Sequence, residues 1–208
     1  MNTVLARIIS IVFHPLLITT YLFALLAFMF PASLYPITPG SRNSFIVSVF
    51  LITFLLPVIN IWLFKLLGVV KSMTMEDRAD RVKPFLLITV IYGVLTWMLY
   101  ARSNFSIGDN LFNLLLIIDA LILFSFIITL FYKASVHSIG IWGAIGILLP
   151  LNRVIEDHSI FIATLVALVL AGLVMSARLQ LNAHTPREVL VGALAGFSIG
   201  FFGMLILF

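Results

Sequence analysis

Long apolar runs alternate with short polar stretches along the whole chain. Seven runs cover residues 8–30, 44–67, 84–101, 111–132, 139–151, 159–176 and 188–208. As a helix, the run 139–151 would be about 20 Å long, short of a hydrocarbon core of about 30 Å, whereas the other runs are long enough to cross it. Because backbone groups in lipid must be hydrogen-bonded within the protein, the pattern predicts an all-α transmembrane bundle of six to seven helices.

Two of these runs contain polar residues that membrane interiors rarely tolerate. His14-Pro15 interrupts the first run, and we expect the proline to kink this helix and His14 to be structural. Asp119 lies inside the run 111–132. An ionisable residue there is a site hypothesis by default, but a neutral or paired structural aspartate is the favoured interpretation.

The composition also indicates an integral membrane protein. Hydrophobic residues make up 62% of the 208 residues and charged residues 10%, whereas soluble domains have about a quarter charged residues. The net charge of +4 favours anionic lipids or phosphorylated substrates over nucleic acid. There is no cysteine, which excludes thiol chemistry. One membrane domain over residues 1–208 fits the length, and the first run is expected to stay in the membrane because no signal-peptide cleavage site follows it.

The junction before the last run carries the most specific pattern. Arg178, His184 and Glu188 follow the spacing R-x5-H-x3-E. Thr185-Pro186 predicts a helix start, and Glu188 would complete a capping box. His184 would then lie just before a helix N-terminus, where the helix dipole and free N–H groups favour phosphate. A simpler interpretation makes Arg178 an interface anchor, Glu188 only a capping partner and His184 a loop residue.

Two further polar stretches, at 68–84 and 133–138, also lie at the ends of apolar runs. The first is either a solvated loop with balanced charges or a basic arm that reaches phosphate. If the four runs after residue 84 that lead up to residue 188 all span, the polar stretches share one membrane face. Together they supply cations, two histidines and a glutamate, namely Arg81, Lys83, Lys133, His137, Arg178, His184 and Glu188. Two histidines among cations suit phosphoryl transfer at helix ends on this face, because one can attack phosphorus while the other protonates the leaving oxygen.

No metal or other cofactor is expected at this face. It contains no carboxylate cluster with metal-ligand spacing, which favours a metal-free mechanism. Elsewhere Glu156, Asp157 and His158 are adjacent in the sequence. Three neighbouring residues rarely converge on one ion, so we do not expect a metal site there either.

The polar blocks resemble the type 2 phosphatidic acid phosphatase superfamily, which includes lipid phosphatases and relatives of vanadium haloperoxidases. The family pattern is K-x6-R-P, then P-S-G-H, then S-R-x5-H-x3-D. Lys83-Pro84 falls on the R-P pair, residues 134–137 fall on the second block, and Arg178, His184 and Glu188 fall on the third. The resemblance covers about residues 71–200, and its most specific part is the third block followed by a glycine-rich helix.

The first block departs most from the family pattern. Glu76 stands where the leading lysine would fall, and Lys83 stands in place of the arginine. We expect Arg81 to supply the missing cation, with Arg78 and Lys71 as alternatives.

The other two blocks also differ from the pattern. Val136 replaces a glycine and removes its conformational freedom, for which Lys133 could compensate with charge. Ala177 replaces the serine of the third block, and Glu188 replaces the aspartate but can still orient an imidazole. These departures leave open a non-catalytic lipid-binding or lipid-transport protein on the same scaffold.

The resemblance implies an integral membrane lipid phosphatase that forms a phosphohistidine without a metal. His184 would be the nucleophile, Glu188 would orient it, and His137 would be the general acid. The backbone near Val136 and several side chains would hold the phosphate, namely Arg81, Lys83, Lys133, Ser135 and Arg178. Candidate substrates are phosphatidic acid, phosphatidylglycerophosphate and undecaprenyl diphosphate. A lipid phosphotransferase would use the same residues.

The location and the partners are expectations of the same kind. We expect a bacterial cytoplasmic membrane and lipids with phosphate head groups as partners. The resemblance implies a site on the periplasmic side, whereas the positive-inside rule would place the basic face in the cytoplasm, so the orientation stays open. Gly192, Gly196 and Gly200 form a small-xxx-small ladder that predicts tight helix packing. The helix over residues 188–208 could also form a homo-oligomer.

Overall fold

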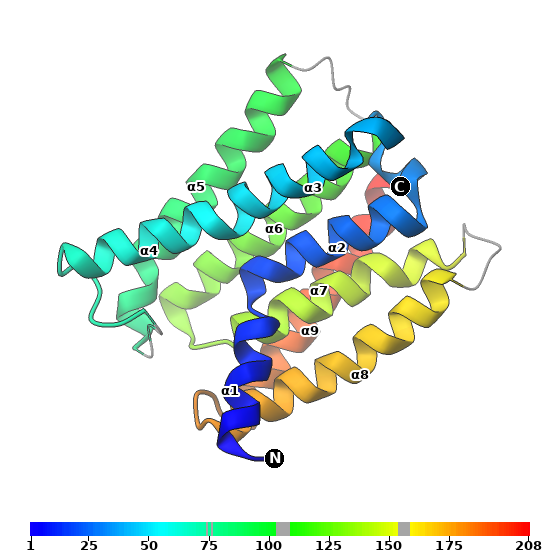
Figure 1. The fold of residues 1–208 in the computed structure, drawn as a ribbon. Coiled ribbons are helices and arrows are strands. Elements are labelled where there is room, and N and C mark those ends of the chain that lie inside the picture. Colours follow the sequence, from blue (N-terminus) through cyan, green and yellow to red (C-terminus); the bar gives the residue numbers. More distant parts are fainter. Residues whose placement is uncertain (74, 76, 103–108, 154–158) are drawn as a thin grey trace.

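The protein is all-helical in the residues that its computed structural model describes, which are 1–73, 75, 77–102, 109–153 and 159–208 (Figure 1). This confirms the predicted all-α class. The α-helices are α1 (Thr3–Val12), α2 (Pro15–Met29), α3 (Arg42–Phe50), α4 (Leu56–Leu66), α5 (Arg78–Arg102), α6 (Asn110–Phe131), α7 (Val136–Leu151), α8 (Ser159–Gln180) and α9 (Pro186–Leu207). The remaining elements are two short 3₁₀ helices, η1 (Pro31–Leu34) and η2 (Pro39–Ser41), and a π-helical segment, η3 (Leu51–Leu55).

Within the described residues, five helical stretches are long and apolar enough to cross a membrane, so the chain is an integral multi-pass membrane protein. They are Pro39–Leu66, Arg78–Ala101, Asn110–Phe131, Ile160–Gln180 and Pro186–Leu207. The helices α1 and α2 pass the same test together but are bent by 56°, and they add a sixth span if the bent pair counts as one. At 16 residues, α7 is about 24 Å long, and a seventh span stays a prediction.

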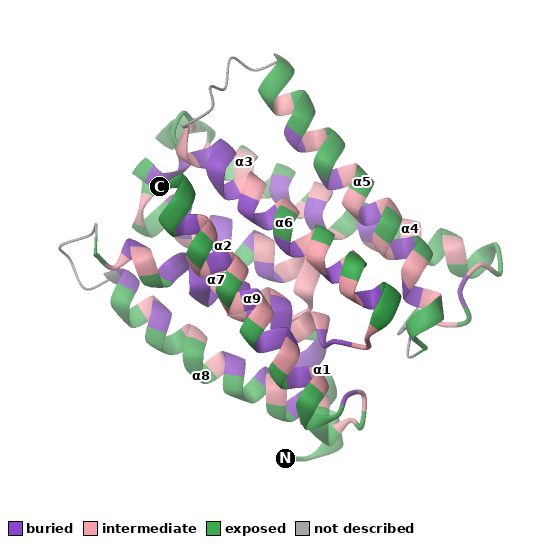
Figure 2. Ribbon diagram, turned by 180° about the vertical axis from the view of Figure 1, so that it is seen from behind, coloured by how far each residue is buried: buried purple, intermediate pink, exposed green. Residues whose placement is uncertain are grey.

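The outer surface of the bundle is apolar, as a lipid environment requires. The helix α8 lies at one edge and is exposed along its outer side (Figure 2). The large side chains exposed there include Phe161, Ile162, Leu165, Val166 and Val169. These residues need no protein partner in a bilayer, because lipid tails are as apolar as they are.

The helix α7 lies inside the bundle and packs closely along α9. The residue pairs in contact are Ser135–Gly192, Ile139–Gly196 and Gly143–Gly200. The contacts advance together along both helices, so the helices run parallel and their N-termini lie at the same end. A Cβ atom at Gly192 would lie 2.6 Å from the carbonyl oxygen of Ser135, so only glycine permits this approach. The predicted tight packing is confirmed within one chain, and a homo-oligomer through this helix stays a prediction.

The first apolar run differs from its prediction. A single kinked helix was expected over residues 8–30, but α1 ends at Val12 and α2 begins at Pro15. The side chain of His14 caps α2, because its Nδ1 accepts a hydrogen bond of 3.3 Å from the backbone N–H of Leu16. Proline at the first position of a helix loses no hydrogen bond, so Pro15 starts a helix here and does not distort one.

Candidate active site

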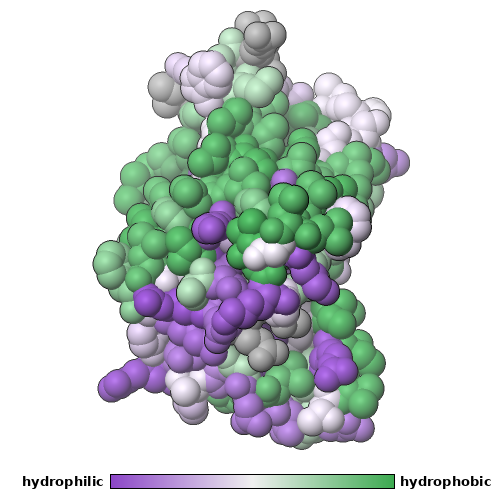
Figure 3. All heavy atoms as spheres, turned by 90° about the vertical axis from the view of Figure 1, so that its left-hand side faces the viewer, coloured by the Kyte–Doolittle hydropathy of each residue, from purple (hydrophilic) through white to green (hydrophobic). Residues whose placement is uncertain are grey.

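The polar ends of several helices surround one cavity of about 630 Å³. Figure 3 views the molecule from this side, where hydrophilic residues gather in the lower half of the face and the upper part is hydrophobic. Two contacts join the polar stretches of the sequence. The backbone N–H of Ser135 donates to the carbonyl of Glu188 over 3.1 Å, and Arg78 donates to the carbonyl of Leu130 at the end of α6. The stretches predicted to share one membrane face therefore meet at one end of the bundle.

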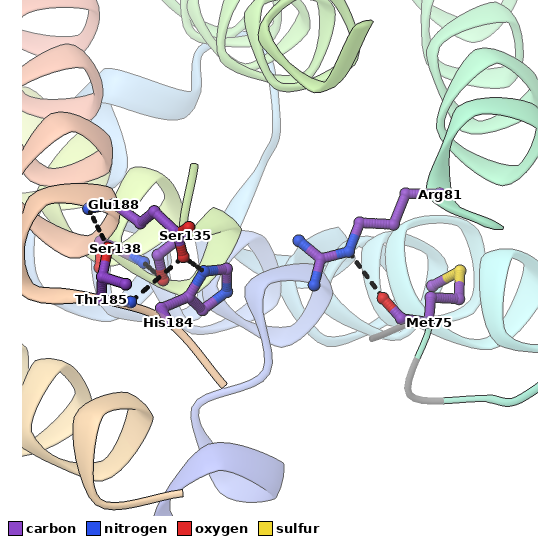
Figure 4. Close-up of polar contacts among 7 residues, drawn as sticks. All are labelled: Met75, Arg81, Ser135, Ser138, His184, Thr185 and Glu188. Carbon is purple, nitrogen blue, oxygen red and sulfur yellow. Dashed lines mark hydrogen bonds and ion pairs between the residues drawn. The ribbon is translucent and has the colours of Figure 1, made fainter. Parts of the chain in front are cut away.

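His184 and Glu188 form a buried pair at the start of α9 (Figure 4). Nδ1 of His184 lies 2.9 Å from Oε2 of Glu188, and the same oxygen accepts the backbone N–H of Thr185 over 3.2 Å. The Thr185 hydroxyl accepts the N–H of Glu188 in return, which completes the predicted capping box. The pair holds the imidazole by Nδ1, and in Figure 4 the other side of the ring faces the guanidinium of Arg81.

The surroundings keep the imidazole of His184 neutral near neutral pH. Burial lowers its pKa from 6.5 to about 4, and the hydrogen bond to Glu188 opposes this shift. The positive charges of Arg81 and Arg178 lower the pKa further. A neutral imidazole that gives its Nδ1 proton to a carboxylate keeps a lone pair on Nε2, which is the form that a nucleophile needs.

Arg81, Arg178 and Lys133 bring positive charge to the cavity. Arg81 is only 6% exposed, and its Nε donates to the carbonyl of Met75 over 2.7 Å. This bond directs the guanidinium toward His184 (Figure 4). Arg178 lies in the last turn of α8 and lines the same cavity. These side chains can stabilise the oxygens of a phosphoryl group, where charge develops during transfer.

The other basic residues of the first block lie elsewhere. Arg78 donates to the carbonyls at the end of α6, and Lys71 pairs with Asp77 over 3.1 Å in an exposed position. Lys83 is exposed on α5 and does not line the cavity. Among these candidates for the missing cation, Arg81 is therefore the one that the fold brings to the cavity. Glu76 lies outside the described residues.

The second block places His137 at the cavity and Ser135 beside it. Nε2 of His137 lies 3.1 Å from the carbonyl oxygen of Ser10, so this nitrogen carries a proton and donates it there. Nδ1 is then the ring nitrogen that can exchange a proton with a ligand. Ser135 is fully buried, and its hydroxyl caps α7 by accepting the N–H of Ser138 over 3.4 Å. Val136 lines the cavity at the position of the family glycine.

The helices α1 and α2 contribute residues to the cavity that were not predicted from the sequence as site residues. Arg7, Ser10 and His14 all line the cavity. The rings of His14 and His137 are 5.6 Å apart at an angle of 77°. The available signal was a histidine directly before a proline in an apolar run, because this pair can end one helix and cap the next.

Apolar side chains line the inner part of the cavity, away from the cations. They come from α2, α5, α6 and α7 and include Leu22, Ile88, Ile118 and Ile147. The cavity can therefore bind a ligand that has a charged head group and an apolar chain.

Asp119 lies on α6 and does not line the cavity. Its Oδ1 has no hydrogen-bond partner in the part of the chain that the structure describes. Within the described residues, no three side chains of His, Asp or Glu come together as metal ligands would. Glu156, Asp157 and His158 lie outside the described residues, and the metal-free mechanism stays a prediction.

Comparison with known proteins gives no relative. No family model, no curated protein and no solved structure matches the chain. The resemblance to type 2 phosphatidic acid phosphatases therefore rests on the quoted residues alone.

Proposed function

We propose that the protein is an integral membrane lipid phosphatase of the type 2 phosphatidic acid phosphatase kind, which works through a phosphohistidine and without a metal. The observation that carries this proposal is the pair of His184 and Glu188. Nδ1 of His184 lies 2.9 Å from the carboxylate of Glu188, and His184 lines a cavity that Arg81 and Arg178 also line. A carboxylate-oriented imidazole among cations is suited to attack on phosphorus.

In the first step, Nε2 of His184 attacks phosphorus and the bond to the lipid oxygen breaks. The proton on Nδ1 stays on the ring and strengthens its hydrogen bond to Glu188 as positive charge develops. A phosphate monoester has an ionisable proton with a pKa of about 6. His137 can accept this proton on Nδ1 and pass it to the leaving lipid oxygen, while its Nε2–H remains bonded to Ser10.

In the second step, water attacks the phosphohistidine and the bond between phosphorus and Nε2 breaks. Nδ1 of His137 accepts a proton from this water and acts as general base. Inorganic phosphate leaves, and His184 returns to its neutral form. Arg81, Arg178 and Lys133 would hold the phosphoryl oxygens in both steps.

The substrate class follows from the walls of the cavity. Apolar residues such as Leu22 and Ile118 continue inward from the cations, which suits the acyl or prenyl chain of a membrane lipid. Phosphatidic acid, phosphatidylglycerophosphate and undecaprenyl diphosphate are candidates. A transferase that moves phosphate to an acceptor alcohol would use the same first step, and adding such an alcohol would reveal its phosphorylated product.

A second candidate is a lipid-binding or lipid-transport protein without catalysis. Two observations favour it. Val136 fills the glycine position of the second block, and the hydroxyl of Ser135 is buried in a helix cap. This candidate predicts that lipid binding or translocation survives the loss of both His137 and His184.

The test is phosphate release from a panel of lipid phosphates in detergent with EDTA, for wild type and His184→Ala. We expect wild type to release phosphate. The rate of release should be lower by about a thousandfold or more in the variant, because the nucleophile is gone. Wild type should also become labelled at His184 by a ³²P-labelled substrate after rapid denaturation. Arg187→Ala is the matched control, since Arg187 is exposed on the first turn of the same helix. Release that survives His184→Ala would overturn the proposal.

A further inference from the structure

The break between α1 and α2 forms part of the cavity wall next to the reacting histidines. Ser10 lies near the end of α1, His14 caps α2, and both line the cavity. The ring of His14 lies 5.6 Å from that of His137. None of these groups from α1 and α2 has a role in the two steps above except the carbonyl of Ser10.

His14 presents a fixed hydrogen-bond donor. Its Nδ1 accepts the backbone N–H of Leu16, so the ring proton of the neutral imidazole is on Nε2. No partner for Nε2 is found among the described residues. Arg178 and His137 line the same cavity as His14.

Ser10 presents a second donor that nothing in the described chain satisfies. The residue is 6% exposed, and its buried hydroxyl has no hydrogen-bond partner there. Buried hydroxyls on α6 bond instead to the carbonyl four residues back, as Ser125 does over 2.8 Å and Thr129 over 2.7 Å. A buried hydroxyl without a partner costs free energy, so the site is suited to a ligand that bonds to it.

The N-terminus of α2 adds to the attraction for an anion. This helix has 15 residues and begins at Pro15, which also lines the cavity. The positive end of its dipole therefore lies beside Ser10 and His14. The guanidinium of Arg7 lines the same cavity from α1.

We propose that Ser10 and His14 form a second phosphate subsite, which holds the non-reacting phosphate of a lipid diphosphate. This inference rests on the proposed function, because His184 is taken to attack the terminal phosphate. It narrows the substrate class from lipid phosphates in general to lipids with two linked phosphates.

The leaving group of a lipid diphosphate needs no proton, which agrees with a subsite made of neutral hydrogen-bond donors. Nε2 of His184 forms a bond to the terminal phosphorus, and the bridging P–O bond breaks. The electron pair stays on the bridging oxygen, which becomes part of a lipid monophosphate. That phosphate is stable as an anion near neutral pH, so it needs hydrogen bonds and positive charge but no proton. Water then attacks the phosphohistidine as in the second step above and gives up its proton to Nδ1 of His137.

The experiment compares a prenyl diphosphate with the prenyl monophosphate of the same chain length, for the full chain in detergent. We expect wild type to have a kcat/KM at least about tenfold higher for the diphosphate. Ser10→Ala and His14→Asn should each lower the ratio of the diphosphate value to the monophosphate value about tenfold, because each removes one hydrogen bond to a charged group that only the diphosphate supplies. Asparagine at residue 14 can still cap α2, so the fold is kept.

Ser48→Ala is the matched control, since this exposed hydroxyl bonds to its own helix at Ser44. Binding of inorganic diphosphate, measured by calorimetry, tests the subsite without turnover, and the two variants should weaken it about tenfold. Equal loss for both substrates, or unchanged diphosphate binding, would overturn the subsite. If wild type releases no phosphate but binds diphosphate through Ser10 and His14, the proposed function fails while the subsite stands.

Discussion

The imidazole of His184 is held at one nitrogen, and the ring faces the cavity. Glu188 occupies Nδ1, and burial together with two arginines keeps the ring from gaining a second proton. The carboxylate therefore serves the geometry of the ring more than its charge in the resting state. In the proposed reaction its charge would matter most when the ring acquires positive charge.

The titration of His184 provides a test of this arrangement. We expect the imidazole to titrate near pH 4, so that it is neutral from about pH 5 upward and kcat/KM does not fall between pH 7 and pH 5 through loss of this group. The measurement is NMR of ¹⁵N-labelled histidine in detergent, with His184→Ala to assign the signal. An imidazole that titrates near 6.5 would contradict the buried position of the ring.

Replacing Glu188 by glutamine separates charge from geometry. The amide can still accept the N–H of Thr185, so the helix start should be kept. The carboxylate of Glu188 raises the pKa of His184. Without this carboxylate, His184 should titrate at a lower pH in Glu188→Gln. The kcat of this variant should fall by about a hundredfold or more, because the positive charge that develops on the ring loses its partner.

At this scale, sequence reasoning works where the geometry is local. His184 and Glu188 are four residues apart at a helix start, so their spacing alone predicts the contact. Arg81 was preferred over Arg78 and Lys71 from the sequence, but only the fold gives the reason, because burial and the bond to Met75 separate these residues. His14 could not be assigned from the sequence, since its place depends on a 56° bend between two helices and on packing against His137.

At the scale of elements, the contact between α7 and α9 positions the site. Both helices begin at the cavity, and the ladder of Gly192, Gly196 and Gly200 sets their separation. The backbone bond from Ser135 to Glu188 ties the two starts together over 3.1 Å. Any change that separates these helices should therefore disturb the second and third blocks at once.

Gly196→Ala tests this dependence. A Cβ atom there would overlap the carbonyl oxygen of Ile139, so we expect a loss of about 1–3 kcal/mol in stability and a lower Tm. Gly172→Ala is the matched control, because α8 leaves open space around that position and the gain in helix propensity is the same. Thermal unfolding in detergent measures both. Equal Tm values for the two variants would contradict the close packing.

The apolar runs predicted the helices well because lipid demands continuous apolar segments. The start of the last helix was also predicted, because α9 begins at Pro186 after the capping residue Thr185. The prediction of one continuous helix over the first run was wrong, because hydropathy does not show where a side chain within an apolar segment caps a helix. Which helices pack together, such as α7 with α9, depends on tertiary contacts that the runs do not record.

At the scale of the whole molecule, the polar stretches that contain Arg81, His137 and His184 meet at one end. The other end contains the start of α6, where Asn110 donates to the carbonyl of Ala32 over 3.0 Å. Since α6 leads from there to the junction with Lys133, the two ends should lie on opposite faces of the membrane. This arrangement holds for either orientation of the chain.

Single cysteines can test the two faces, because the chain has none of its own. Asn43 is exposed at the start of α3, and Arg187 is exposed beside the site, so the test uses Asn43→Cys and Arg187→Cys. An impermeant maleimide should label one of them in intact cells and the other only after permeabilisation. Labelling of both from the same side would contradict the proposed crossing, and the side on which Arg187→Cys reacts gives the orientation.

The cavity also has a consequence for how the protein is made. Its walls contain residues that are synthesised at very different times. The carbonyl of Ser10 near the N-terminus bonds to His137, and the pair of His184 and Glu188 forms only when the start of α9 is present. A chain emerging from the ribosome inserts its early helices first. Until α9 is in place, α7 lacks its parallel neighbour and the cavity lacks His184. The proposed hydrolysis would therefore begin only after α9 has been inserted, and a nascent chain without α9 would not attack the lipids that surround it.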